Sequence, residues 1–260
     1  TSGGNTITIE GSNFGPVHLT SIKVGSTVSS NVVYISFSSL RCTVGPGVGK
    51  QLDVSVTVDS LAGSLARSYY YDPPVITAVS PLFGPTSGNF TVTVKGGNFG
   101  GVDNSATRTV QIGGAVCTPV DSLWSHDQVV CRLAAGTGAS KPAFVKIQAD
   151  GDANRDQSSN VASMFSYNSP IIQLLSPSNH PAAGGNPVIV TGRNFGARSD
   201  VISVFIGSTS CSSPTVSDSN NAVINETIQC IVAPGSGFGQ SVQVVVDGQT
   251  AYGEDLQGYN

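Results

Sequence analysis

The stretch FTVTVKGGNFG, residues 90–100, decides the fold of this chain. It joins a run in which apolar and polar residues alternate to the turn Gly-Gly-Asn-Phe-Gly. Alternation with a period of two indicates a β-strand that is buried on one face. The glycine-rich turn by itself has two interpretations, a phosphate-binding loop or a structural corner, and the rest of the sequence separates them.

The triplet Asn-Phe-Gly occurs three times, and the same order of segments surrounds each copy. Each unit has a Gly-Asn opening, an alternating strand, the corner, and a closing Tyr-Asp or Tyr-Asn. This repetition predicts three repeats, with boundaries at 1–73, 74–168 and 169–260. In each corner the Asn suits a positive φ, the Phe is expected to point into the core, and the Gly lets the next segment approach closely. The predicted corner residues are Asn13, Phe14, Gly15, Asn98, Phe99, Gly100, Asn194, Phe195 and Gly196.

A phosphate site receives little support from these turns. A dinucleotide-binding loop needs G-x-G-x-x-G at the start of a helix, so that amides and helix dipole face the phosphates. No helical periodicity follows Gly100. The loop GPGVGKQ, residues 45–51, imitates a Walker loop but has Val44 and Gln51 where that motif needs Gly and Ser or Thr. The structural corner is therefore the preferred interpretation.

Composition sets the fold class and excludes several partners. Only 11 % of the 260 residues are charged, 12 basic against 16 acidic, and the basic residues are scattered. Nucleic acid needs clustered Lys and Arg, so it is not an expected ligand. No apolar run approaches the roughly 20 residues that span a bilayer. Short alternating runs separated by Gly, Pro, Asn and Ser predict an all-β chain of sandwiches.

With this pattern established, the chain resembles the IPT/TIG family of immunoglobulin-like domains. The residues that carry the resemblance in the second repeat are 76–81 with Gly84, Gly88-Asn89, Gly96-x-Asn98-Phe99-Gly100, 112–114, Cys117 and Cys131. The resemblance covers essentially the whole chain, in three copies. It implies three tandem immunoglobulin-like (E-set) β-sandwiches. The family occurs in plexin-type and growth-factor-receptor ectodomains, in surface proteins, as accessory modules of carbohydrate-active enzymes and in DNA-binding transcription factors, so function by family is an analogy.

The five cysteines follow the repeats. Cys117 and Cys131 occupy the same positions in the second repeat as Cys211 and Cys230 in the third, which predicts one disulfide in each. In the first repeat Ser29 replaces the first cysteine, so Cys42 is expected to be a buried free thiol or an intermolecular link. Disulfides imply an oxidising compartment, and the predicted location is extracellular or the cell surface.

Other candidate sites are weaker. The sequons at Asn89 and Asn225 are possible N-glycan acceptors. Asp150, Asp152, Asn154 and Asp156 are spaced like calcium ligands, but the glycine and glutamate of an EF-hand loop are missing, and a solvated hairpin tip is the preferred alternative. No C-x-x-C occurs, and His18, His126 and His180 sit at non-equivalent surface or loop positions, so zinc is disfavoured. No cofactor is predicted.

The function predicted from these observations is non-enzymatic. No nucleophile elbow or recurring Ser-His-acid set is present. We expect protein–protein contact, either by an adhesion or recognition ectodomain or by a subunit of an extracellular filament that binds copies of itself. The alternative is an accessory binding module of a carbohydrate-active or other secreted enzyme. The first repeat lacks a counterpart of the strands at 73–81 and 169–177, which a boundary at Thr1 or a strand donated by another chain would explain. Such a sandwich exposes a sheet edge and a groove.

Overall fold

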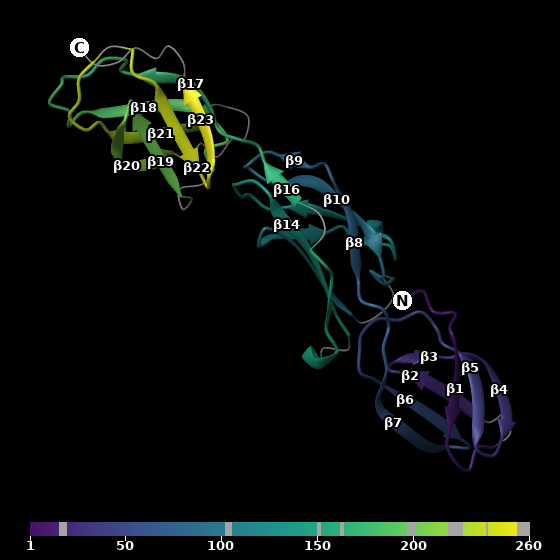
Figure 1. The fold of residues 1–260 in the computed structure, drawn as a ribbon. Helices are drawn as coiled ribbons and strands as arrows, with labels where there is room; N and C mark the ends of the chain where they lie inside the picture. Colours follow the sequence, from purple (N-terminus) through teal and green to yellow (C-terminus); the bar gives the residue numbers. More distant parts are fainter. Residues whose placement is uncertain are drawn as a thin grey trace.

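The structure is a computed structural model that describes residues 1–15, 20–101, 106–149, 152–161, 164–196, 201–217, 226–237 and 239–253. Its described elements are β-strands with two short 3₁₀ turns, so the predicted all-β class is confirmed. The strands form three bodies in a row, with β1–β7 at one end, β8–β16 in the middle and β17–β23 at the other end (Figure 1). Thr1 lies beside the junction of the first two bodies.

Repeat 1 contains two separate sheets. Their strand orders are β1-β5-β4 and β3-β2-β6-β7, and all pairings are antiparallel. The core between them is made by side chains that alternate along the strands, including Ile22, Leu40 and Leu52. The bounds are β1 (Thr6–Glu10), β2 (Thr20–Val24), β3 (Thr27–Val28), β4 (Ser30–Ser36), β5 (Ser39–Thr43), β6 (Leu52–Val58) and β7 (Leu61–Tyr69).

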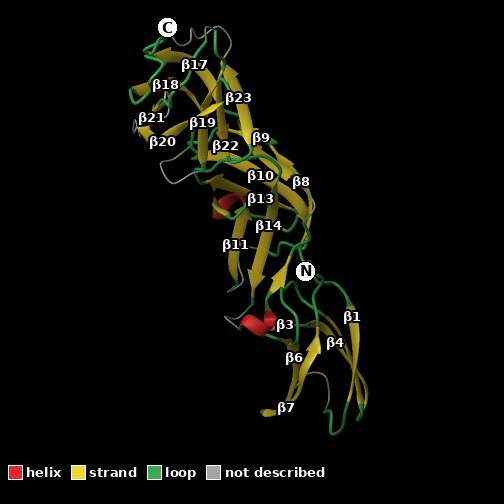
Figure 2. Ribbon diagram, turned by 60° about the vertical axis from the view of Figure 1, so that its left-hand side comes forward, coloured by secondary structure: helices red, strands yellow, loops and turns green. Residues whose placement is uncertain are grey.

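Repeat 2 is a sandwich whose strands form one continuous hydrogen-bonded path, β8-β10-β13-β12-β11-β14-β16-β9. The 3₁₀ turns η2 and η3 stand out from the strands (Figure 2). The bounds are β8 (Val75–Ser80), β9 (Phe83–Gly84), β10 (Phe90–Gly97), β11 (Thr107–Ile112), β12 (Ala115–Pro119), η2 (Asp121–Leu123), β13 (Gln128–Leu133), β14 (Lys141–Gln148), η3 (Ala153–Arg155), β15 (Gln157–Ser158) and β16 (Met164–Tyr167).

Repeat 3 has the same arrangement, with the path β17-β18-β21-β20-β19-β22-β23. Its described core is dominated by valine and isoleucine, which suit half-buried strands. The bounds are β17 (Ile171–Ser176), β18 (Pro187–Arg193), β19 (Ile202–Ile206), β20 (Thr209–Ser217), β21 (Glu226–Ile231), β22 (Val242–Val246) and β23 (Gln249–Gly253).

The three Asn-Phe-Gly corners have the same geometry. Asn13, Asn98 and Asn194 have φ values of 63°, 62° and 60°, in the left-handed region that Asn tolerates. The phenylalanine that follows each of them is buried in the core of its repeat. In repeat 2 the indole of Trp124 also donates hydrogen bonds to the carbonyls of Phe99 and Gly100, at 3.1 Å each. In all three repeats the corner thus places its phenylalanine in the core.

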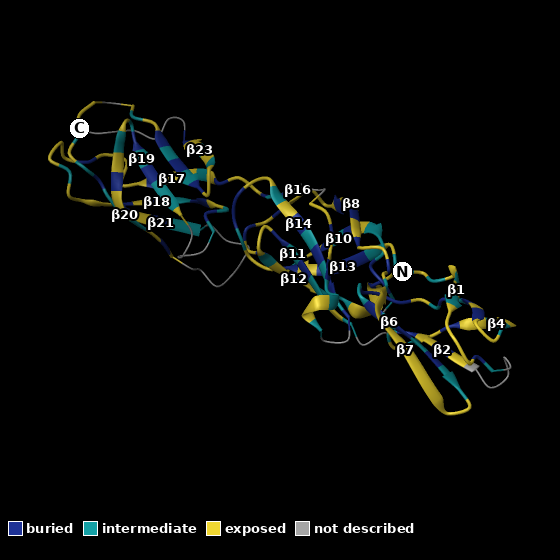
Figure 3. Ribbon diagram, turned by 60° about the horizontal axis from the view of Figure 1, so that its bottom comes forward, coloured by how far each residue is buried: buried dark blue, intermediate teal, exposed yellow. Residues whose placement is uncertain are grey.

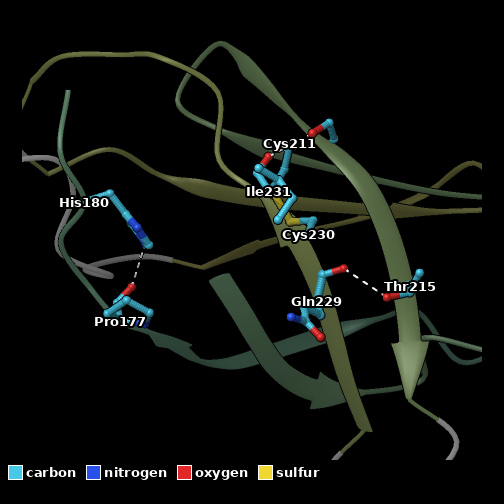
Figure 4. Close-up of a disulfide and its surroundings, with 8 residues drawn as sticks. Pro177, His180, Cys211, Thr215, Gln229, Cys230 and Ile231 are labelled. Carbon is cyan, nitrogen blue, oxygen red and sulfur yellow. Dashed lines mark hydrogen bonds between the residues drawn. A yellow bond between two sulfur atoms is a disulfide. The ribbon is translucent and has the colours of Figure 1, made fainter. Parts of the chain in front are cut away.

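The cysteines lie where the repeats place them. Cys117 and Cys131 are joined by a disulfide, as are Cys211 and Cys230 on β20 and β21 (Figure 4). Cys42 is free and buried. Figure 4 also shows His180, whose Nε2 lies 3.0 Å from the Pro177 carbonyl oxygen; it is in a loop but is buried.

The segment 152–158 contributes to the contact between repeats 1 and 2, which differs from the solvated hairpin tip expected for it. The buried amide of Gln157 accepts a hydrogen bond from the Gly49 backbone (2.9 Å) and donates one to the Tyr71 carbonyl (2.6 Å). Nearby, Arg155 pairs with Asp53 at 3.3 Å. The insertion therefore holds the end of repeat 1 against repeat 2.

Replacing Gln157 with alanine is expected to loosen this junction. The change would leave the Gly49 amide and the Tyr71 carbonyl without their partner, at a cost of about 1–3 kcal/mol for each group that stays buried. Hydrogen exchange of residues 49–53 should become faster, and small-angle scattering should show a broader range of shapes. Gln229→Ala, an exposed change in repeat 3, is the control. Equal effects of the two substitutions would contradict the assigned role.

Candidate binding groove

The groove of repeat 1 lies between β1, the corner that follows it, and the strands β6 and β7. Its volume is about 910 Å³. The acidic residues Glu10 and Asp59 are in its lining, and no Lys or Arg is among the lining residues that the structure describes. The apolar side chains that line it are Ile7, Ile9, Phe14, Val54, Val56, Val58, Leu61, Leu65 and Tyr69. We refer to this surface as the repeat 1 groove.

The groove exists because of how strands are paired in this repeat. β1 pairs with β5 on one side, and no described strand pairs with its other edge. In repeats 2 and 3 the equivalent edges are covered, since β8 pairs with β10 and β17 pairs with β18. An uncovered edge presents a row of unpaired backbone N–H and C=O groups.

The other wall of the groove is β7, a nine-residue strand at the edge of its sheet. Its first eight residues are exposed, and Figure 3 shows it as a yellow arm beside β6. Leu61 is 78 % exposed and Leu65 is 67 % exposed. Apolar side chains this open, in the lining of an apolar groove, mark a surface suited to binding.

Tyr71, which closes repeat 1, anchors the far end of the same sandwich. Its hydroxyl donates a hydrogen bond to the Gly45 carbonyl at 2.8 Å, as the Tyr167 hydroxyl does to the Ala134 carbonyl at 2.9 Å in repeat 2. Burial, with a smaller contribution from the neighbouring Tyr69, raises the pKa of Tyr71 to about 12. The ring is therefore held as the neutral phenol over the whole physiological range.

This shifted pKa predicts alkaline unfolding of repeat 1. The unfolded tyrosine has a pKa near 10, so the native state binds the proton more tightly. The stabilisation is complete below pH 10 and disappears as the pH rises from about 10 to 12, an effect of about 2 kcal/mol. Tyr71→Phe should remove the loss over this interval, measured by hydrogen exchange of β6. A wild-type profile that is flat from pH 10 to 12 would contradict the prediction.

The predicted site residues outside the groove are placed as follows. Asn89 is exposed, so its side chain is accessible to modifying enzymes, whereas Asn225, His18 and the closing Tyr259-Asn260 pair lie outside the described residues. Leu61, Leu65 and Gly11 line the groove but were not among the site residues predicted from the sequence. Alignment of the repeats, which sets Gly11 beside Gly96 and Gly192, carries the signal that could have identified Gly11.

The three calcium-like residues that the structure describes, Asp152, Asn154 and Asp156, make separate contacts. Asp152 accepts hydrogen bonds from Asn154 and contacts Arg155, while Asp156 pairs with Lys146 at 2.6 Å. Asp150 lies outside the described residues. Within the described ranges there is no group of three or more His, Cys, Asp or Glu residues that could hold a metal ion. These contacts favour a structural role in the junction.

A family model for the IPT/TIG domain matches this chain three times, at residues 1–71, 74–167 and 170–258. The chain belongs to the IPT/TIG domain family. The match covers nearly all of the sequence, so the resemblance drawn from the corner motifs is confirmed. Each IPT/TIG match contains one Asn-Phe-Gly corner and one of the three described cores.

Solved structures similar to this IPT/TIG chain include the full extracellular region of plexin A4, at 19 % identity and a TM-score of 0.32. That alignment covers 98 % of this chain and 32 % of the plexin chain. A surface glycan-binding protein from Prevotella bryantii matches at 11 % identity and a TM-score of 0.43, over 70 % of this chain and 41 % of the other. At these values the solved structures add nothing to the family match.

No helix in the described part of the chain is long and apolar enough to cross a membrane.

Proposed function

We propose that this chain is a non-catalytic array of IPT/TIG domains that acts outside the cell by contact with another protein. The repeat 1 groove is its contact surface, and this groove is the observation that carries the proposal. It places Leu61 and Leu65, which are 78 % and 67 % exposed, in a space of about 910 Å³. The two disulfides support an oxidising, extracellular setting.

The lining of the groove favours a protein over a carbohydrate. A sugar-binding site needs aromatic faces that are open for stacking on sugar rings. The two aromatic residues of this groove, Phe14 and Tyr69, are buried and half-buried, and the rest of its apolar lining is aliphatic. Aliphatic side chains beside free backbone groups match a polypeptide instead. The accessory-module alternative is therefore the weaker one.

The proposal can be tested with the fluorescently labelled chain and cells of its own organism. We expect the chain to bind the cell surface, and trypsin treatment of the cells to abolish that binding. The double variant Leu61→Glu, Leu65→Glu should lose binding. The control is Val201→Glu, which places one such charge at a 77 % exposed valine of repeat 3.

Two results would contradict the proposal: equal binding by the groove variant and the control, or binding that glycosidase abolishes and trypsin does not. The second result would support the carbohydrate alternative. Negative-stain imaging of native material distinguishes contact within a filament from contact by a separate ectodomain. Continuous fibres would identify a filament subunit, whereas isolated rods would identify an adhesion or recognition ectodomain.

A further inference from the structure

We propose that Asn89 carries an N-linked oligosaccharide in the native protein. This inference goes beyond the proposed function, because it concerns a covalent modification of repeat 2 and does not depend on the repeat 1 groove. The acceptor sequence is Asn89-Phe90-Thr91, in which the middle residue is not proline. The argument combines this sequence with the backbone position that Asn89 occupies.

Repeats 1 and 3 have glycine at the position of Asn89. In each repeat the backbone N–H at this position donates a hydrogen bond to the carbonyl two residues after the cysteine at 42, 131 or 230. The donor and acceptor pairs are Gly4 with Val44 (2.8 Å), Asn89 with Leu133 (2.7 Å) and Gly185 with Val232 (2.8 Å). The Gly-Asn openings of the repeats are therefore offset by one residue in repeat 2, where Asn89 stands in place of a glycine.

This position requires a left-handed backbone. The φ angle is 90° at Gly4, 82° at Gly185 and 55° at Asn89. Glycine adopts such angles readily because it has no Cβ, and asparagine is one of the few other residues that tolerate them. Repeat 2 thus replaces the residue best suited to the backbone by one that adds a side-chain amide.

The added amide serves no packing purpose that the structure shows. The side chain of Asn89 makes no hydrogen bond among the described residues, whereas the Nδ2 atom of the corner residue Asn98 donates one to the Pro73 carbonyl at 3.1 Å. At Gly4 and Gly185 an added Cβ would meet nothing within 4 Å, so the position opens to solvent. Asn89 and Thr91 are both exposed. The folded repeat therefore has room for a sugar chain on Asn89.

The modification replaces one N–H bond of the Asn89 amide. Its Nδ2 atom forms a bond to the anomeric carbon of an oligosaccharide that is donated by a polyprenyl pyrophosphate. The bond from that carbon to the pyrophosphate oxygen breaks, the lipid pyrophosphate leaves, and the amide proton passes to a base of the transferase. The two disulfides support passage of the chain through an oxidising secretory compartment, where such transfer takes place.

A glycan on Asn89 leaves the proposed contact surface free. Asn89 is not in the lining of the repeat 1 groove. It follows Gly88, where an added Cβ would lie 2.2 Å from the Ala135 nitrogen, and the neighbouring Ala134 carbonyl accepts the hydroxyl of Tyr167. Asn89 thus lies at the end of repeat 2 from which the chain continues into repeat 3. A bulky glycan there would keep other chains away from this end and direct contact to repeat 1.

The first test uses the native protein purified from its source. Trypsin releases Asn89 in the peptide 68–95, separate from Asn225 in the peptide 199–260. Enzymatic removal of N-glycans in heavy-oxygen water converts a glycosylated asparagine to an aspartate that carries the heavy oxygen. We expect mass spectrometry to find this label at position 89 in most molecules. A peptide 68–95 that is unmodified in the native protein would overturn the proposal.

Variants of the full chain, secreted by cells of the same organism, test the acceptor sequence. Thr91→Ala should lose the glycan on peptide 68–95, whereas Thr91→Ser should keep it, because either hydroxyl residue completes the sequence. Asn89→Gly should lose the glycan and still fold, since repeats 1 and 3 have glycine at this position. A glycan that persists on peptide 68–95 of Asn89→Gly would show attachment to another residue and overturn the proposal.

A stability measurement on unglycosylated chains tests whether Asn89 has a structural role instead. Asn89→Gly should unfold at the same denaturant concentration as the wild type or a higher one, followed by Trp124 fluorescence. Asn98→Gly is the matched control in the same repeat, because Asn98 has a φ of 62° and its amide binds the Pro73 carbonyl. It should unfold at a lower concentration. An equal loss in both variants would show that Asn89 is kept for packing, against the proposal.

Discussion

Replacing Gly96 with alanine is expected to destabilise repeat 2 by about 3 kcal/mol or more. The new Cβ would lie 1.9 Å from the Val75 carbonyl oxygen and 2.6 Å from the Phe99 ring, so β8 must move away from β10. That movement exposes Ile76 and Val79, and each buried side chain of this size contributes about 1.5–3 kcal/mol. The loss should appear in denaturant unfolding followed by fluorescence of Trp124, the one tryptophan, which is buried in this repeat.

Two controls distinguish the clash with the Val75 carbonyl from the general effect of replacing a glycine. Gly97→Ala changes the neighbouring residue of the same strand, where an added Cβ meets nothing within 4 Å, and should have little effect. Gly11→Ala shares the contact with the corner phenylalanine but has no strand carbonyl among the three nearest atoms. Its effect on repeat 1 should be clearly smaller. Equal losses at all three glycines would show that the strand carbonyl is not the cause.

Replacing Ser29 with cysteine is expected to give repeat 1 a third disulfide, with Cys42, and to stabilise it by about 3 kcal/mol in the chain-entropy model. The positions match those of the existing bonds. Ser29 lies opposite Ile22, since its N–H donates to the Ile22 carbonyl at 2.8 Å, as Cys117 lies opposite Val110. Cys42 pairs with Ile7, as Cys131 pairs with Val92.

The disulfide would join side chains that are already neighbours. The Ser29 hydroxyl lies beside the Cys42 thiol, and burial raises the pKa of that thiol. Oxidation of the variant is therefore best carried out during refolding, when the thiols are accessible. Thiol titration in denaturant should find one free cysteine in the wild type and none in the oxidised variant. Two remaining thiols, or a thermal midpoint equal to that of Ser29→Ala, would show that the pair cannot be bridged.

The fold of repeat 1 should be kept in the oxidised variant, because repeats 2 and 3 carry this cross-link in the native protein.

Sequence reasoning predicted the parts of the fold that depend on local chemistry. The Asn-Phe-Gly corner could be identified because few residues tolerate a positive φ, and Asn13, Asn98 and Asn194 all adopt one. The sandwich class followed from alternation and from three copies in phase.

The parts that sequence reasoning missed depend on contacts between distant residues. Gln157 stands in a polar insertion, and polarity alone predicts a solvated tip. Its burial arises only because the end of repeat 1 packs against it, with Val48 entering the core of repeat 2. In the same way, leucine is usually a core residue, so the sequence gives no sign that Leu61 and Leu65 are exposed. Only the pairing of β6 with β7 shows that they line the repeat 1 groove.

The two junctions of the array differ in what holds them. Between repeats 1 and 2 the Arg155–Asp53 ion pair is accompanied by the Gln157 amide and Val48, which are buried and to which salt in solution has little access. Between repeats 2 and 3, Lys141 pairs with Asp247 at 2.6 Å on the surface, and Gln249 donates to the Tyr167 carbonyl at 3.0 Å. Exposed ion pairs weaken as ionic strength rises. Added salt should therefore weaken the junction between repeats 2 and 3 more than the junction next to the groove-bearing repeat.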